Sequence, residues 1–106
     1  MEKYLIHDAQ QFNEDGFTKI NIIRNGRSTA FLLNFLPGQV MKSHNHPDRE
    51  LYFHVIEGSG VFLIDGEELA VEKGDVFYCG EEEQVGFTNT SGEKVSIFAT
   101  MTKLTE

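Results

Sequence analysis

The chain has 106 residues, 40% of them hydrophobic, which is enough for one domain with its own core and leaves no room for a second. Nine lysines and arginines stand against seventeen aspartates and glutamates, and the net charge of −8 argues against nucleic acid or an anionic membrane as a partner. No segment resembles a signal peptide or a membrane span, and the single cysteine cannot form an internal disulfide. We therefore expect one cytoplasmic, non-membrane domain over residues 1–106.

Short runs rich in β-branched and aromatic residues follow one another along the chain, each closed by a turn signal. The first run, 18–24, leads into Asn25-Gly26, a pair that suits the positive φ angles of a tight hairpin turn. Residues 28–36 are the expected return strand. Leu36-Pro37-Gly38 predicts the next turn.

A second hairpin is predicted around Asp65-Gly66, between strands over 60–64 and 67–71. The remaining expected strands cover 76–79, 85–87 and 94–102. Eight or nine short strands with tight turns predict an all-β domain, either a closed barrel or a double-sheet jelly roll, because both protect the sheet edges.

Two histidines, His44 and His46, form the clearest functional feature of the sequence. In an extended chain, residues two apart point to the same side, so both imidazoles can reach one metal ion. The pair taken alone is equally compatible with a surface role. Glu50 follows four residues later as a candidate carboxylate ligand.

The surrounding sequence resembles that of the cupin family. Residues 38–50, running on to Glu57-Gly58-Ser59-Gly60, resemble the first cupin motif, and Gly74-Asp75-Val76-Phe77 with Asn89 resembles the second. The resemblance implies a double-stranded β-helix jelly roll. It also implies a divalent metal ion, such as nickel, zinc, iron or manganese, held by two histidines and a glutamate of the first motif and one histidine of the second. His44 and His46 match the first pair.

The other two ligand positions of the resemblance depart from the pattern. Val85 stands where the second motif keeps its histidine, while Gln84 lies one residue earlier. Counting back from Gly58 gives Leu51 at the glutamate position, whereas counting forward from His46 gives Glu50. A matched displacement of one residue would produce a metal site formed by His44, His46, Glu50 and Gln84.

The alternation along the strand that follows the histidines bears on this ambiguity. Leu51, Phe53 and Val55 form an apolar face that suits the core, so Glu50 should point outwards unless a β-bulge after Pro47 redirects it. The opposite face also carries apolar side chains, and we expect it to be covered in a homodimer; its residues are Tyr52, His54 and Ile56.

Two other features have simple structural interpretations. The acidic run Glu81-Glu82-Glu83 is predicted to be a solvated loop rather than a cation site. Cys79 is predicted to be a small buried residue rather than a nucleophile.

Nine phenylalanines are many for this length, and they predict an apolar barrel interior with the histidine pair as its rare polar group. Such a pocket suits a small organic ligand. Two hypotheses follow: a metal-dependent enzyme, such as a dioxygenase or isomerase, or a non-catalytic ligand-binding or sensor barrel whose metal site has decayed. Fold alone cannot choose between them.

Overall fold

The computed structural model describes residues 1–105 and consists almost entirely of strands. One helical turn, α1, lies near the N-terminus. The elements are α1 (Ile6–Ala9), β1 (Thr18–Asn25), β2 (Ser28–Phe35), β3 (Val40–His44), β4 (Arg49–Glu57), β5 (Ser59–Ile64), β6 (Glu67–Glu72), β7 (Val76–Cys79), β8 (Val85–Thr88) and β9 (Val95–Lys103).

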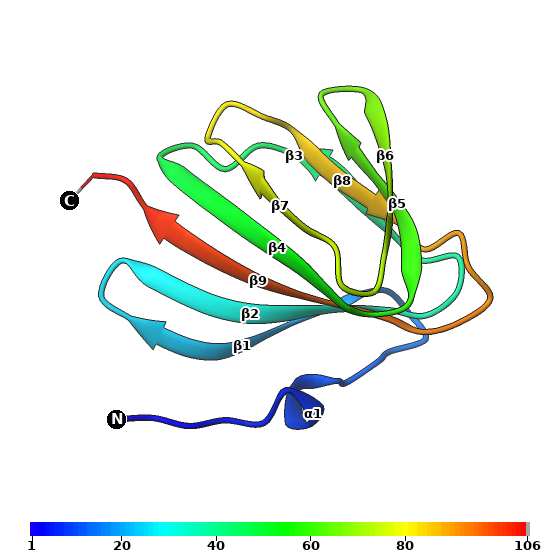
Figure 1. Cartoon of the computed structure of the whole chain (residues 1–106), viewed down its shortest axis with the longest axis horizontal. Coiled ribbons are helices and arrows are strands. Elements are labelled where there is room, and N and C mark those ends of the chain that lie inside the picture. Colours follow the sequence, from blue (N-terminus) through cyan, green and yellow to red (C-terminus); the bar gives the residue numbers. More distant parts are fainter. Residues whose placement is uncertain (106) are drawn as a thin grey trace.

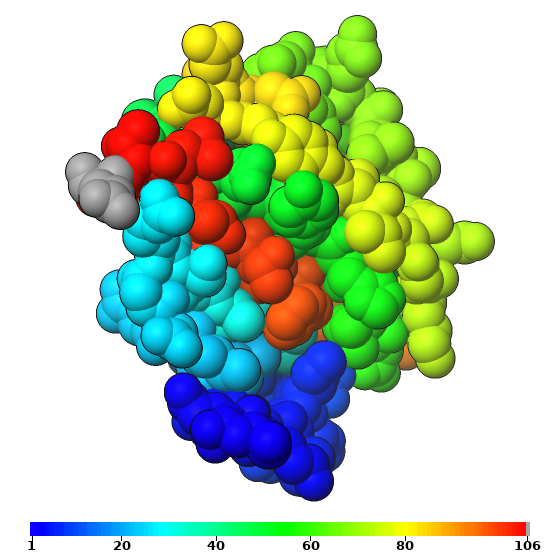
Figure 2. Space-filling model, turned by 60° about the vertical axis from the view of Figure 1, so that its left-hand side comes forward, coloured from blue at the N-terminus to red at the C-terminus, as the bar shows by residue number. Residues whose placement is uncertain are grey.

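The strands form two antiparallel sheets that enclose the core between them (Figure 1). The larger sheet has the order β1-β2-β9-β4-β7, and the smaller has the order β3-β8-β5-β6. Figure 2 shows the larger sheet, with β9 in orange and red between β2 in cyan and β4 in green. The chain therefore has the all-β, double-sheet jelly roll that its turns predict, with the double-stranded β-helix architecture that the resemblance implies.

The two predicted hairpin turns have different outcomes. Asp65 and Gly66 both have positive φ angles, 49° and 83°, and Ile64 pairs with Glu67, as predicted for a type I′ turn. The first turn lies one residue later than predicted. Asn25 still belongs to β1 and pairs with Ser28, so the loop consists of residues 26–27, with glycine providing the positive φ of 60°.

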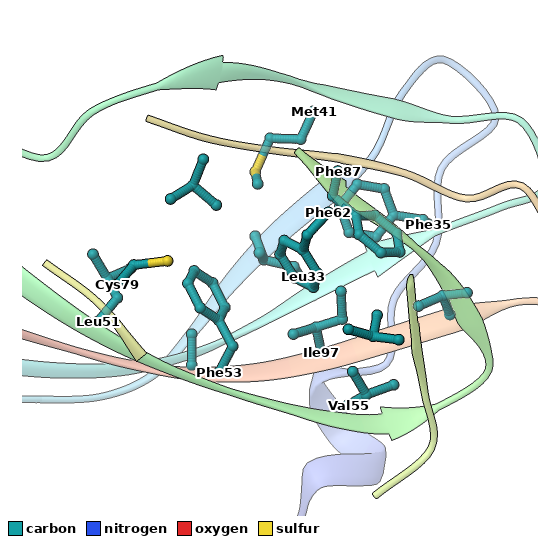
Figure 3. Close-up of a cluster of buried hydrophobic side chains, with 14 of the residues drawn as sticks. Leu33, Phe35, Met41, Leu51, Phe53, Val55, Phe62, Cys79, Phe87 and Ile97 are labelled. Atoms are coloured by element: carbon teal, nitrogen blue, oxygen red, sulfur yellow. The ribbon is translucent and has the colours of Figure 1, made fainter. Parts of the chain in front are cut away.

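Phenylalanine rings fill the centre of the core (Figure 3). The ring of Phe62 lies 4.7 Å from that of Phe87 and 5.3 Å from that of Phe53, measured between centroids, within the range of favourable aromatic pairs. The β4 side chains at positions 51, 53 and 55 are buried, whereas Tyr52 and His54 are exposed. The predicted inner face of β4 is thus confirmed.

The segment that precedes β1 is tied to the larger sheet by polar contacts. The buried amide of Asn34 in β2 donates to the carbonyl oxygen of Ala9 at 2.8 Å and accepts from the Ser96 hydroxyl at 2.8 Å. Gln10 also donates to Ser96 Oγ at 3.2 Å. Among residues 1–105 there is no helix long and apolar enough to cross a membrane.

Candidate metal and ligand site

The histidine pair lines a small pocket between the two sheets. Its volume is about 90 Å³, and its walls are mostly apolar; the lining residues are Phe17, Lys19, Phe31, Leu33, Met41, His44, His46, Leu51 and Phe53. A larger hollow of about 560 Å³ lies at the other ends of β2, β4 and β9, and no histidine is among its lining residues. The smaller pocket therefore brings the predicted imidazoles together with an apolar surface.

A β-bulge in β3 turns His44 towards this pocket. Met41 pairs with Phe87 and His44 pairs with Val85, so β3 uses three residues where β8 uses two. Strict alternation would place Ser43, rather than His44, on the same side as Met41. The extra residue puts His44 on the pocket side, and both Met41 and His44 line it.

Gly86 in β8 leaves room for this bulge. A Cβ atom at Gly86 would lie 2.6 Å from Ser43 Oγ and 3.0 Å from both the Met41 carbonyl oxygen and the Ser43 amide nitrogen. Two of these neighbours are backbone atoms of the bulge, which cannot move away without displacing it. The absence of a side chain at position 86 is therefore a condition for the orientation of His44.

A tight turn between β3 and β4 holds His46. The Arg49 amide donates to the His46 carbonyl oxygen at 3.1 Å, Pro47 occupies the second position, and Asp48 has a φ of 64°. Proline followed by a positive φ is the arrangement of a type II turn. The Glu81 carboxylate accepts a hydrogen bond from the Asp48 amide at 2.9 Å, which links the turn to the loop between β7 and β8.

The two imidazoles lie close to each other, with ring centroids 4.5 Å apart. His44 Nδ1 is 2.9 Å from the Lys42 carbonyl oxygen. Because a carbonyl can only accept, this contact keeps the proton on Nδ1 and leaves the Nε2 lone pair for a ligand. Hydrogen bonds of this kind orient metal-binding histidines in other proteins.

The surroundings of His46 favour its neutral form. Burial in the pocket lowers the pKa of His46 below its ordinary value, and the neighbouring His44, Lys19 and Arg49 lower it further. A neutral imidazole retains the lone pair that a metal requires.

The structure does not bring the four-residue ligand set together. Glu50 lies on the outer face of β4, where its carboxylate accepts a hydrogen bond from the Tyr78 hydroxyl at 3.0 Å, as strand alternation predicts. No bulge follows Pro47 to redirect it, because Glu50 and Leu51 pair regularly with Thr102 and Met101 of β9.

Gln84 is exposed, and its backbone N–H donates to the Asp65 carboxylate at 2.8 Å. Val85 is instead fully buried and lies directly opposite His44. The register therefore puts Val85, not Gln84, on the inner face, and the matched displacement that would combine Glu50 with Gln84 is not observed.

The donors present fit a divalent ion only in part. Two neutral imidazoles are good ligands for nickel, zinc or iron. In residues 1–105, however, no group of three or more histidine, cysteine, aspartate or glutamate side chains is placed to hold a metal. A metal bound here would take its remaining ligands from water or from a bound organic molecule.

Lys19 is a pocket residue that the sequence did not single out. Its ammonium group lies 4.5 Å from the centroid of the Phe31 ring, and both residues line the pocket. Lysines are common on the solvated face of an edge strand, so the sequence alone does not suggest a pocket position. The pairing of Lys19 with Leu33 shows that the two residues share the inner face of the sheet. Cys79, in contrast, is buried as predicted, and burial raises the pKa of its thiol to about 11.

Comparison with known proteins shows to which family the chain belongs. A Cupin domain family model matches residues 31–101, which include every strand from β3 to β8 and most of β2 and β9. The chain belongs to the cupin family.

Similar proteins support this assignment and its fold. The chain is 33% identical over 55 residues to the tetracenomycin polyketide synthase protein TcmJ of Streptomyces glaucescens, a match that covers 50% of this chain and 37% of that protein. The structure of TT1209 from Thermus thermophilus has a TM-score of 0.91 at 22% identity, covering 97% of this chain and 98% of that one. A Klebsiella pneumoniae protein with a double-stranded β-helix domain has a TM-score of 0.91 at 16% identity, covering 97% and 90% of the two chains. These two structural similarities concern the fold alone.

Proposed function

We propose that this cupin binds a small organic molecule next to a divalent metal ion held by His44 and His46. The observation that carries the proposal is the location of both imidazoles in the wall of one apolar pocket. The hydrogen bond from His44 Nδ1 to the Lys42 carbonyl and the lowered pKa of His46 both favour free nitrogen lone pairs.

The proposed roles follow from the positions of the residues. His44 and His46 would supply nitrogen ligands, while Phe31, Leu33 and Phe53 would exclude water from the apolar part of the ligand. A metal with two protein ligands keeps several positions open. We therefore infer that oxygen atoms of the organic molecule complete the coordination.

A metal-dependent reaction, such as that of a dioxygenase or isomerase, is the second candidate. Open metal positions are typical of catalytic rather than structural sites, and this observation favours it. The relative TcmJ is named as a polyketide synthase protein, which fits a carbonyl-rich organic molecule as ligand or substrate. Turnover of such a molecule by the iron-loaded protein, absent from a His44→Ala variant, would establish catalysis.

Metal analysis tests the main proposal. Protein purified without chelator and then incubated with nickel, zinc or iron should retain about one ion per chain after desalting. The domain should stay folded when the ion is removed, because the two histidines lie at the edge of the pocket rather than among the buried phenylalanines. Retention of no ion under any of these conditions would contradict the metal site and leave a metal-free ligand pocket.

We also propose that the chain forms a homodimer through the outer face of β4 and β7. Tyr52, Val76 and Tyr78 are 52%, 65% and 50% exposed, and β7 is an edge strand of the larger sheet. Large apolar side chains at an exposed edge favour pairing with another copy. Light scattering at micromolar concentration should give twice the monomer mass of 12.0 kDa, and a Tyr52→Glu variant should be monomeric. A wild-type monomer would contradict the dimer.

A further inference from the structure

Four basic side chains gather beside the histidine pocket. A hollow of about 250 Å³ is lined by Arg24, Asn25, Gly26, Arg27, Thr29, Arg49, Met101 and Lys103. Its four basic residues are called the basic rim; they are Arg24, Arg27, Arg49 and Lys103. They are four of only nine lysines and arginines in a chain with a net charge of −8, and none of the described residues lining this hollow is acidic.

The strand register shows that the basic rim continues the inner face of the larger sheet. Thr29 pairs with both Arg24 and Met101, and Arg49 pairs with Lys103. Because side chains alternate, Thr29 shares its face with Phe31, two residues further along β2.

The same alternation holds in β4. Arg49 lies on the face of Leu51, and both Leu51 and Phe31 line the histidine pocket. The red C-terminal end of β9 lies next to the cyan tip of the β1–β2 hairpin, which brings the members of the rim together (Figure 2). The basic rim therefore lies on the same inner face as the histidine pocket, two residues further towards the ends of these strands.

One further observation connects the rim with the histidine pocket. Lys19, an exposed residue that lines the histidine pocket, adds another positive charge at its wall. A ligand that occupies the pocket therefore experiences positive charge on its outer side.

The size of the pocket requires a larger ligand to extend beyond it. An engineered apolar cavity of about 150 Å³ holds one benzene ring, whereas the histidine pocket has only about 90 Å³. The open hollow at the rim is the continuation available on the inner face. Guanidinium groups there present forked donors that match the two oxygens of a carboxylate.

We propose that the ligand is an organic carboxylate whose apolar part lies in the histidine pocket and whose carboxylate is bound by the basic rim. This inference rests on the proposed function only in taking the histidine pocket as the ligand site; it does not require a bound metal. It adds the charge and the orientation of the ligand.

The test uses chelator-treated full-length protein and two probes of equal chain length, hexanoate and hexan-1-ol, followed by NMR or calorimetric titration. Hexanoate should bind about tenfold more tightly than hexan-1-ol, as expected for a carboxylate that gains charge-assisted hydrogen bonds. Its affinity should fall as salt concentration rises. Equal affinity for the two probes, or binding of neither, would overturn the proposal.

Variants locate the binding. Arg49→Gln should weaken hexanoate about tenfold and leave hexan-1-ol unchanged. Lys103→Gln, on a different strand and outside the turn that holds His46, should also weaken hexanoate binding. Lys73→Gln is the matched control, since it changes the net charge equally at the exposed turn between β6 and β7 and should leave the affinity within about twofold. An equal effect of all three variants would show general electrostatics and overturn the assignment.

Nickel titration separates this inference from the proposed metal site. Selective hexanoate binding without nickel retention would support the rim and contradict the metal. Nickel retention without selectivity for hexanoate would do the reverse.

Discussion

The end of β3 with the turn that follows it, and β8, which pairs with β3, contribute to the pocket in different ways. The first provides His44 from a bulge and His46 from a tight turn. The second provides Val85 and Gly86, an apolar side chain and a space. The first segment thus carries the histidines while β8 shapes their surroundings.

Of the substitutions that test this difference, Gly86→Ala should have the largest effect on stability and nickel binding. The added Cβ would press against the backbone of the bulge, so we expect a loss of about 1–3 kcal/mol in the free energy of unfolding and weaker nickel binding through displacement of His44. Denaturant unfolding and nickel titration measure both. Gly92→Ala is the control, because a Cβ there meets nothing within 4 Å. Unchanged nickel affinity in Gly86→Ala would show that the bulge does not depend on this glycine.

Val85→His tests whether β8 can supply a further donor. Val85 lies opposite His44 on the inner face, so an imidazole there should tighten nickel binding at least about tenfold, or roughly 1.4 kcal/mol. Gln84→His, at the exposed neighbouring position, should give no gain. A gain in Gln84→His alone would contradict the register described above, and a gain in neither variant would count against a metal centre in this barrel.

Glu81→Ala should have a smaller effect. Its carboxylate accepts from the Asp48 amide in the turn that holds His46, but the contact is exposed, so we expect a loss of about 1 kcal/mol or less and a few-fold weaker nickel binding. Glu82→Ala removes the same charge from the neighbouring exposed position and serves as the control. Identical nickel affinities of the two variants would show that only the loop charge matters.

The smallest expected effect concerns Cys79. Burial raises the pKa of this thiol to about 11, so almost none of it is thiolate at pH 8. A thiol reagent should therefore react slowly with the folded protein and rapidly after unfolding. Fast reaction in the native state would contradict the burial of Cys79.

The sequence predicted what depends on local pattern. Alternation identified the inner face of β4, and the pair Asp65-Gly66 identified the turn between β5 and β6. Both signals lie within a few adjacent residues. The first hairpin was misplaced by one residue, since glycine can begin a turn as readily as it can end one.

The rest of the site depends on pairing between distant strands. The bulge that directs His44 exists only in relation to β8, and the burial of Val85 rather than Gln84 follows from the same register. The basic rim combines β1, β4 and β9, whose residues are separated by tens of positions along the chain. Short sequence motifs contain no information about which distant strands pair with one another.

The most direct measurement is a nickel titration of the wild type beside His44→Ala, His46→Ala and the outward-facing control His54→Ala. If the pair forms the site, each pocket variant should weaken nickel binding at least about a hundredfold, more than the usual effect of losing a residue that only orients a ligand. His54→Ala should match the wild type, and all four proteins should keep the same β-sheet circular dichroism spectrum. Undiminished nickel binding in His44→Ala and His46→Ala would contradict a metal site at this pair.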